Sequence, residues 1–237
     1  MAVPQASLER SPKSPDHIPD TSRIRNTAAE IMFRHDREAE DLDDRMYLSK
    51  WSLTNHSTRL SMIMGTICRK RNLAPMLVQL GEDMGFLHDV SKAHPANSKH
   101  RERREWSESE RVEFRCRHPA DSALWIESFR NQVCIDDWSP YYEWLITGVT
   151  CHHDPSGIKD PPWLIQMVYD VCFADKFESA MEDRENPKMG QGGAVEFVQS
   201  YEIERENPNH SLRLRYIFSS KLIIAELYGL NLEELDA

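Results

Sequence analysis

The chain has 237 residues, of which 40% are hydrophobic and 29% charged, enough for one globular domain with a sizeable core. Its formal net charge of −10 disfavours general binding to nucleic acids or anionic membranes, because those surfaces repel an acidic protein. No apolar run reaches the roughly 18 to 20 residues that span a bilayer, and the N-terminal stretch lacks the apolar core of a signal peptide. We therefore expect a cytoplasmic protein without a membrane segment.

The N-terminal residues 1–25 carry four prolines among serines and charged residues, which predicts a disordered tail. Residues 27–44 are charged and favour a helix, and their only apolar cluster is at 31–33, so we expect a peripheral helix with His35 and Asp36 on its surface. No alternating Val/Ile-rich strand and no internal repeat follows, so residues 26–237 are predicted to form one all-α domain.

An amphipathic helix is predicted over residues 47–71, where apolar side chains recur at steps of three and four residues. His56 falls on this apolar face, and Arg59 lies beside it. A lone histidine on an apolar face is commonly a hydrogen-bonded core residue, and a metal ligand is the alternative. The basic residues 69–71 close the helix, where cations complement the helix dipole.

The next helix is predicted to start near Pro75 and to end before Pro95, since the residue preceding proline resists the α conformation. His88 and Asp89 stand next to each other at its inward-facing end, with Lys92 one turn further on. An imidazole nitrogen and a carboxylate oxygen at one helix end suit Fe, Mn, Zn or Co. Residues 97–117 are strongly charged and are predicted to form an exposed connector or lid with a modest basic patch at 99–104.

Two further histidine positions lie at predicted helix ends. His118 precedes Pro119 and is expected to open a helix, where a ligand and a structural role are equally open. The apolar stripe of a helix over 141–153 extends into His152 and His153, before the turn residues 154–157. Two histidines at an inward-facing helix end are rarely explained by packing alone.

The helix predicted over residues 163–181 places Asp175 on its apolar stripe, where an unpaired carboxylate would cost roughly several kcal/mol. Asp170 is one position off the stripe and is expected to be exposed or bonded locally. Two closing helices are predicted over 194–205 and 211–228, the second ended by Gly229. The five cysteines occur singly and predict reduced thiols.

The inward-facing polar residues together form a candidate centre for two divalent metal ions. One ion would be held by His56, His88, Asp89 and Asp175, and the other by Asp89, His118, His152 and His153, so that Asp89 bridges them. Fe or Mn is the first choice of metal, with Zn, Co, Ni and Mg as alternatives.

This order of histidines and aspartates resembles the HD-domain superfamily of metal-dependent phosphohydrolases, and within it the HD-GYP branch of cyclic-dinucleotide phosphodiesterases. The resemblance covers residues 51–181 and includes HSxR at 56–59, LHDxxK at 87–92, HPxxS at 118–122 and an ADxFDA-like segment at 174–179. The Gly-Tyr-Pro triplet of the branch is absent after His153, so cyclic di-GMP does not follow as the substrate. Ser52 stands where some members carry a glutamate, which favours two metals over three.

The resemblance implies hydrolysis of a cyclic dinucleotide or another phosphorylated small molecule. Asp89 and Lys92 would act in catalysis, and Arg59 and Lys92 would bind substrate phosphates. Two alternatives stay open: an HD-fold diiron oxygenase, which the ligands alone do not separate from a hydrolase, and a non-catalytic regulatory HD module, which usually loses ligands. A homodimer is also left open.

Overall fold

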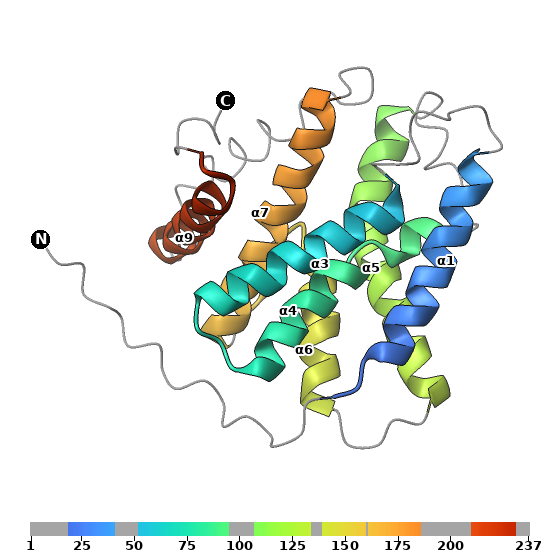
Figure 1. Ribbon diagram of the computed structural model, residues 1–237, viewed down its shortest axis with the longest axis horizontal. Helices are drawn as coiled ribbons and strands as arrows, with labels where there is room; N and C mark the ends of the chain where they lie inside the picture. The colour runs from blue at the N-terminus through green and yellow to red at the C-terminus, as the bar shows by residue number, and fades with distance from the viewer. Residues whose placement is uncertain are drawn as a thin grey trace, which may run out of the picture.

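The computed structural model describes residues 19–40, 52–94, 107–133, 139–159, 161–185 and 210–230. Within these ranges the chain is all-α, as predicted, with seven α-helices, two short 3-10 helices and no strand. The helices are α1 (Ser22–Glu40), α3 (Leu53–Lys70), α4 (Pro75–Leu87), α5 (Glu108–Val133), α6 (Ser139–Thr150), α7 (Pro162–Glu185) and α9 (His210–Tyr228), and the 3-10 helices are η1 (Val90–Ala93) and η3 (Pro155–Gly157). In Figure 1, α1 and α9 lie at opposite sides of the bundle, with α3 and α4 between them.

Helix α1 lies at one side of the bundle and packs one of its faces into the core (Figure 1). It begins at Ser22, inside the stretch predicted as a tail, whereas residues 1–18 lie outside the described part of the chain. Ile24, Ala28 and Met32 are buried at 1%, 0% and 0% exposure. Their spacing of four residues puts one apolar stripe of α1 against the core.

His35 and Asp36 are also buried, which corrects their expected surface location. Asp36 accepts hydrogen bonds from the backbone N–H groups of Leu53 (2.9 Å) and Thr54 (3.0 Å). These are donors of the first turn of α3, which have no partner within their own helix. A carboxylate at a helix N-terminus also complements the helix dipole, so Asp36 fixes the start of α3 against α1.

Helix α3 begins at Leu53, six residues after the predicted start at 47; residues 41–51 are not described. Ser52 is its N-cap, and its hydroxyl accepts a hydrogen bond from the backbone N–H of Asn55 (3.2 Å). The helix ends where Asn72 takes a φ of 55°, a left-handed conformation that asparagine tolerates. Pro75 then opens α4 as predicted.

Helices α3 and α4 pack with their backbones in close approach. Gly85 makes this possible, because a Cβ atom at its position would lie 2.8 Å from the backbone oxygen of Leu60. The apolar side chains predicted to point inward from α4 are fully buried: Leu77, Leu80, Met84 and Leu87. The crossing brings His56 of α3 and His88, just after α4, into contact.

A buried ion pair joins Arg71, just after α3, to Asp170 of α7, and two serines of α9 hydrogen-bond to it, Ser219 to Arg71 (2.8 Å) and Ser220 to Asp170. Asp170 is 1% exposed and accepts hydrogen bonds from Arg71 Nε (2.8 Å), Arg71 Nη2 (2.7 Å) and the Ser220 hydroxyl (2.7 Å). Asp170 is therefore not exposed; it accepts one local hydrogen bond, from Gln166 (3.3 Å), but its ion pair joins it to a distant part of the chain. Helix α9 ends at Gly229, which has a φ of 64°, as predicted. The helix predicted over 194–205 lies outside the described residues.

In the described part of the chain, no helix has the length and apolar character needed to cross a lipid bilayer. No disulfide joins the cysteines of these ranges.

Candidate metal centre

The turn after α4 presents His88 and Asp89 to the interior of the bundle. His88 Nδ1 donates a hydrogen bond to the carbonyl oxygen of Gly85 (2.9 Å), so its other nitrogen, Nε2, points toward the carboxylates. Both residues are buried, at 0% and 1% exposure. Lys92, on η1, donates a hydrogen bond to Asp89 Oδ2.

Four buried residues form the first part of the centre, which we call the Asp175 group: His56, His88, Asp89 and Asp175. His56 Nε2 lies 3.2 Å from Asp175 Oδ1 and 3.4 Å from His88 Nε2. The four ligand atoms lie within 4.8 Å of one another. They come from α3, the end of α4 and α7, so the group exists only when these three helices pack together.

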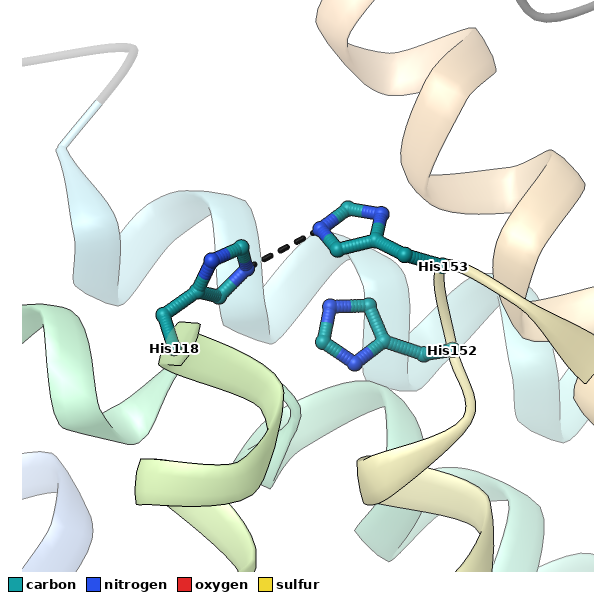
Figure 2. Close-up of side chains that lie close together, drawn as sticks. All are labelled: His118, His152 and His153. Atoms are coloured by element: carbon teal, nitrogen blue, oxygen red, sulfur yellow. Dashed lines mark hydrogen bonds between the residues drawn. The ribbon is translucent and has the colours of Figure 1, made fainter. Parts of the chain in front are cut away.

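Three histidines form the second part, which we call the His153 group: His118, His152 and His153. Figure 2 shows the three rings turned toward one another, with His118 from α5 and the other two from the segment after α6. His118 Nε2 and His153 Nε2 are hydrogen-bonded at 2.9 Å. His152 Nδ1 donates to the carbonyl oxygen of Val149 (2.6 Å), which orients its Nε2 inward, as Gly85 does for His88.

Asp89 lies between the two groups, with one carboxylate oxygen toward each. Its Oδ2 is 3.2 Å from His88 Nε2 and 3.9 Å from His56 Nε2. Its Oδ1 is 3.2 Å from His118 Nε2 and 3.9 Å from His152 Nε2. The structure thus brings together all seven residues singled out in the sequence, in the predicted two sets, with Asp89 between them.

The donor atoms of the centre fit a pair of metal ions. Asp89 Oδ1 and His152 Nε2 are buried and have no hydrogen-bond partner among the described residues. Such buried polar atoms are costly unless they bind something, so a ligand or an ion would complete them. An ion about 2.0 to 2.2 Å from nitrogen and oxygen ligands separates opposite ligand atoms by about 4 to 4.4 Å, close to the observed spacing. Mixed imidazole and carboxylate donors suit Fe, Mn, Zn and Co.

Electrostatics keep four of the candidate ligands, Asp89, Asp175, His152 and His153, in states that bind cations. Burial raises the pKa of Asp89 and of Asp175, but the nearby histidines, and for Asp89 also Lys92, hold both pKa values well below the usual range. Burial and the neighbouring His88 lower the pKa of His152 to about 3, and burial likewise lowers the pKa of His153. His88 differs: burial lowers its pKa, but Asp89 and Asp175 outweigh burial and raise it to about 9.

Arg59, predicted to bind substrate, lies one turn after His56 on α3 and pairs with Glu178, one turn after Asp175 on α7. Arg59 Nε donates to Glu178 Oε2 at 2.6 Å. The side chain of Arg59 is 31% exposed, whereas that of Glu178 is 7% exposed. This second contact between α3 and α7 holds the guanidinium beside the Asp175 group.

His118 lies inside α5 and not at the start of a helix as predicted. The helix begins at Glu108, so it takes in the last part of the stretch predicted as a lid, and Pro119 stands in its interior. The His118 carbonyl accepts a hydrogen bond from the Ser91 hydroxyl (2.9 Å), which itself accepts one from Ser122 (2.9 Å). These serines tie α5 to η1 and set the position of His118 relative to Asp89.

Ser91, Ser122 and Glu178 were not identified as positioning residues from the sequence. Ser122 and Glu178 fall within the motifs at 118–122 and 174–179, but a motif does not show which partner a side chain meets.

Comparisons of the chain with protein-family models, with curated proteins and with solved structures gave no match. The resemblance to the HD-domain superfamily therefore rests on the residues of the centre and their motifs.

Proposed function

We propose that this chain is a metal-dependent phosphohydrolase of the HD-domain type, acting as a phosphodiesterase on a cyclic dinucleotide or another nucleotide. The observation that carries the proposal is the position of Asp89, whose two oxygens lie at 3.2 Å from histidines of different groups. A carboxylate shared in this way is suited to bridging two cations.

Two divalent ions, iron or manganese in preference, would be held by the Asp175 group and the His153 group, with Asp89 common to both. When bound, such ions supply Lewis acidity, which makes water acidic enough to act at neutral pH and neutralises charge on a phosphate. The hydrogen bonds of His88 to Gly85 and of His152 to Val149 fix the two rings with Nε2 inward. Ligands oriented in this way lose little entropy on binding a metal.

Lys92 would stabilise negative charge on a nonbridging phosphate oxygen. Its ammonium group already contacts Asp89, so it lies at the centre of the site, and its side chain is 17% exposed. A fixed positive charge at a buried position is worth more than one in water, because the surroundings screen it less. Arg59, held by Glu178, would contact a second phosphate of a dinucleotide.

Hydrolysis of bis(4-nitrophenyl) phosphate tests the proposal. The chain is assayed with added Mn²⁺, and with Fe²⁺ in the presence and absence of oxygen, beside cyclic dinucleotides and 4-nitrophenyl phosphate. We expect diester hydrolysis that needs metal and not oxygen. Asp89→Asn should lower the rate of diester hydrolysis by more than about 100-fold. Mutation of the residues that hydrogen-bond to metal ligands already costs about 10- to 100-fold in activity, and Asp89 would be a ligand itself.

The matched control is His94→Gln, which changes a histidine outside both groups and should retain full activity. Turnover that requires both iron and oxygen would replace the proposal with the oxygenase reading. Absence of hydrolysis with every metal and substrate would leave the regulatory module.

A further inference from the structure

We propose that the two groups bind metal in a fixed order, the His153 group first, and that Lys92 sets this order by competing with the second ion for Asp89 Oδ2. The inference rests on the proposed metal centre and adds an order and an internal competitor to it.

The contact between Lys92 and Asp89 is one-sided. Lys92 Nζ binds Oδ2, the oxygen that lies 3.2 Å from His88 in the Asp175 group. The other oxygen, Oδ1, faces His118 and His152 and is not the atom that Lys92 contacts. An ion entering the Asp175 group must therefore share Oδ2 with the ammonium or displace it, whereas an ion entering the His153 group meets Oδ1 directly.

The other ligand atoms of the Asp175 group are engaged with one another. His56 Nε2 lies 3.2 Å from Asp175 Oδ1, and His88 Nε2 lies 3.6 Å from the same oxygen. These contacts between imidazoles and carboxylates stabilise the group by themselves. A metal ion must replace them, and this cost lowers its apparent affinity.

The His153 group is less engaged and easier to reach. His152 Nε2 has no hydrogen-bond partner in the described part of the chain, and the contacts to open are those of His118 Nε2 with His153 Nε2 (2.9 Å) and with Asp89 Oδ1 (3.2 Å) (Figure 2). His153 is half-buried, whereas all four residues of the Asp175 group are buried. An ion that binds the His153 group thus has fewer contacts to break, at a group that includes one partly exposed ligand.

Charge alone would favour the opposite order, because the Asp175 group contains two carboxylates and the His153 group shares only one. Lys92 reverses this preference in our account, since its ammonium offsets one of the two carboxylate charges at the atom where an ion would bind. Removal of Lys92 should therefore strengthen the weaker site selectively.

Titration of the metal-free full-length chain with Co²⁺, followed by calorimetry and visible absorption, tests this order. We expect two classes of site in the wild type. Lys92→Met should tighten the weaker class by about tenfold or more, as expected for loss of a close charge pair, with the tighter class unchanged. Lys92→Arg keeps the charge and should leave the weaker class near its wild-type affinity, which separates loss of charge from loss of folding.

Lys176→Met is the matched control. Lys176 follows Asp175 in the chain and interacts electrostatically with His153, whereas Lys92 is the lysine that contacts Asp89. It should affect the two classes alike and weakly. His153→Ala should remove the tighter class and His56→Ala the weaker one. Equal tightening of the weaker class by Lys92→Met and Lys176→Met, or loss of the weaker class in His153→Ala, would overturn the order while leaving the metal centre intact. No Co²⁺ binding at all would overturn both.

Discussion

Gly85 lies against the backbone of Leu60 so closely that α4 has no room for a side chain there. A Cβ atom would lie 2.8 Å from the Leu60 oxygen and 3.0 Å from the Ser61 nitrogen. Both helices continue from this contact into the candidate metal centre, with His56 one turn before Leu60 and His88 three residues after Gly85. The distance between the two histidines therefore depends on a glycine.

Gly85→Ala should separate the two helices and weaken both folding and metal binding. The added methyl group meets backbone atoms, which do not move aside as a flexible side chain does, so we expect a loss of about 1 to 3 kcal/mol in the free energy of unfolding. Urea unfolding measures this loss of stability. Co²⁺ titration should show a lower affinity of the Asp175 group for the ion. Gly157→Ala is the control, because a Cβ atom there meets nothing within 4 Å. Equal stability of the two variants would contradict the tight crossing.

Asp36→Ala should destabilise the start of α3. It removes the acceptor of the Leu53 and Thr54 N–H groups, and we expect a loss of about 0.5 to 2 kcal/mol in the free energy of unfolding, comparable to loss of a capping side chain. The comparison is Asp20→Ala, which removes an exposed acceptor of the Ser22 N–H group at the start of α1. Thermal unfolding should show a larger decrease in Tm for Asp36→Ala than for Asp20→Ala. A larger decrease in Tm for Asp20→Ala would refute the role given to Asp36.

Asp83 should make stability depend on pH. It is fully buried between α1 and α6, accepts hydrogen bonds from Thr21 (3.2 Å) and the Tyr141 hydroxyl (2.5 Å), and is paired with Arg25. Burial raises its pKa above the usual 3.8, and this effect exceeds the opposing effect of Arg25. The folded state then binds the Asp83 proton more tightly than the unfolded state.

A carboxyl group with a raised pKa contributes stability at low pH and loses it as the pH rises from about 4 through its folded pKa. Asn does not titrate, so the free energy of unfolding of the wild type minus that of Asp83→Asn should decrease over this window. Urea unfolding of both proteins at several pH values measures the difference. An increase with pH would mean that Arg25 lowers the pKa instead.

Arg71→Met should loosen α9. The change leaves Asp170 buried without its guanidinium partner, and breaking a buried pair from one side costs about 3 to 5 kcal/mol. Arg69→Met, two residues earlier, removes an arginine that is 58% exposed and pairs with Glu82, and should cost under about 1 kcal/mol. Chemical unfolding of both variants measures their losses in the free energy of unfolding. Similar losses would show that the buried pair stabilises the fold no more than the exposed one.

The sequence predicted the helices and the seven residues of the centre because both depend on local periodicity. The apolar stripes of α4, α6 and α7 run into His88, His152 and Asp175, so a buried polar residue stands out on its own helix. The seven residues were assigned to two sets that share Asp89, and the structure places them in the same sets.

The errors concern residues whose environment is set by distant parts of the chain. Asp36 was expected at the surface because its neighbours in sequence are charged, and Asp170 was expected to be exposed or bonded locally because it is one position off the apolar stripe of its helix. Asp36 instead bonds to the start of α3, and Asp170 bonds to Arg71 just after α3 and to Ser220 of α9. His118 was placed at a helix start because proline is favoured in the first turn and disrupts a helix interior. In α5, Pro119 is nevertheless internal, and the His118 carbonyl bonds to Ser91 across the bundle.

The metal content of the chain, purified without chelator and without oxygen, tests the central claim most directly. We expect about two equivalents of iron or manganese per chain in the wild type, as a pair of ions sharing one carboxylate requires. Asp89→Ala should lose both, whereas His94→Gln should retain them. Less than about a tenth of an equivalent in the wild type, even after metal is added back, would contradict the centre, because ligands of this type bind divalent metals tightly.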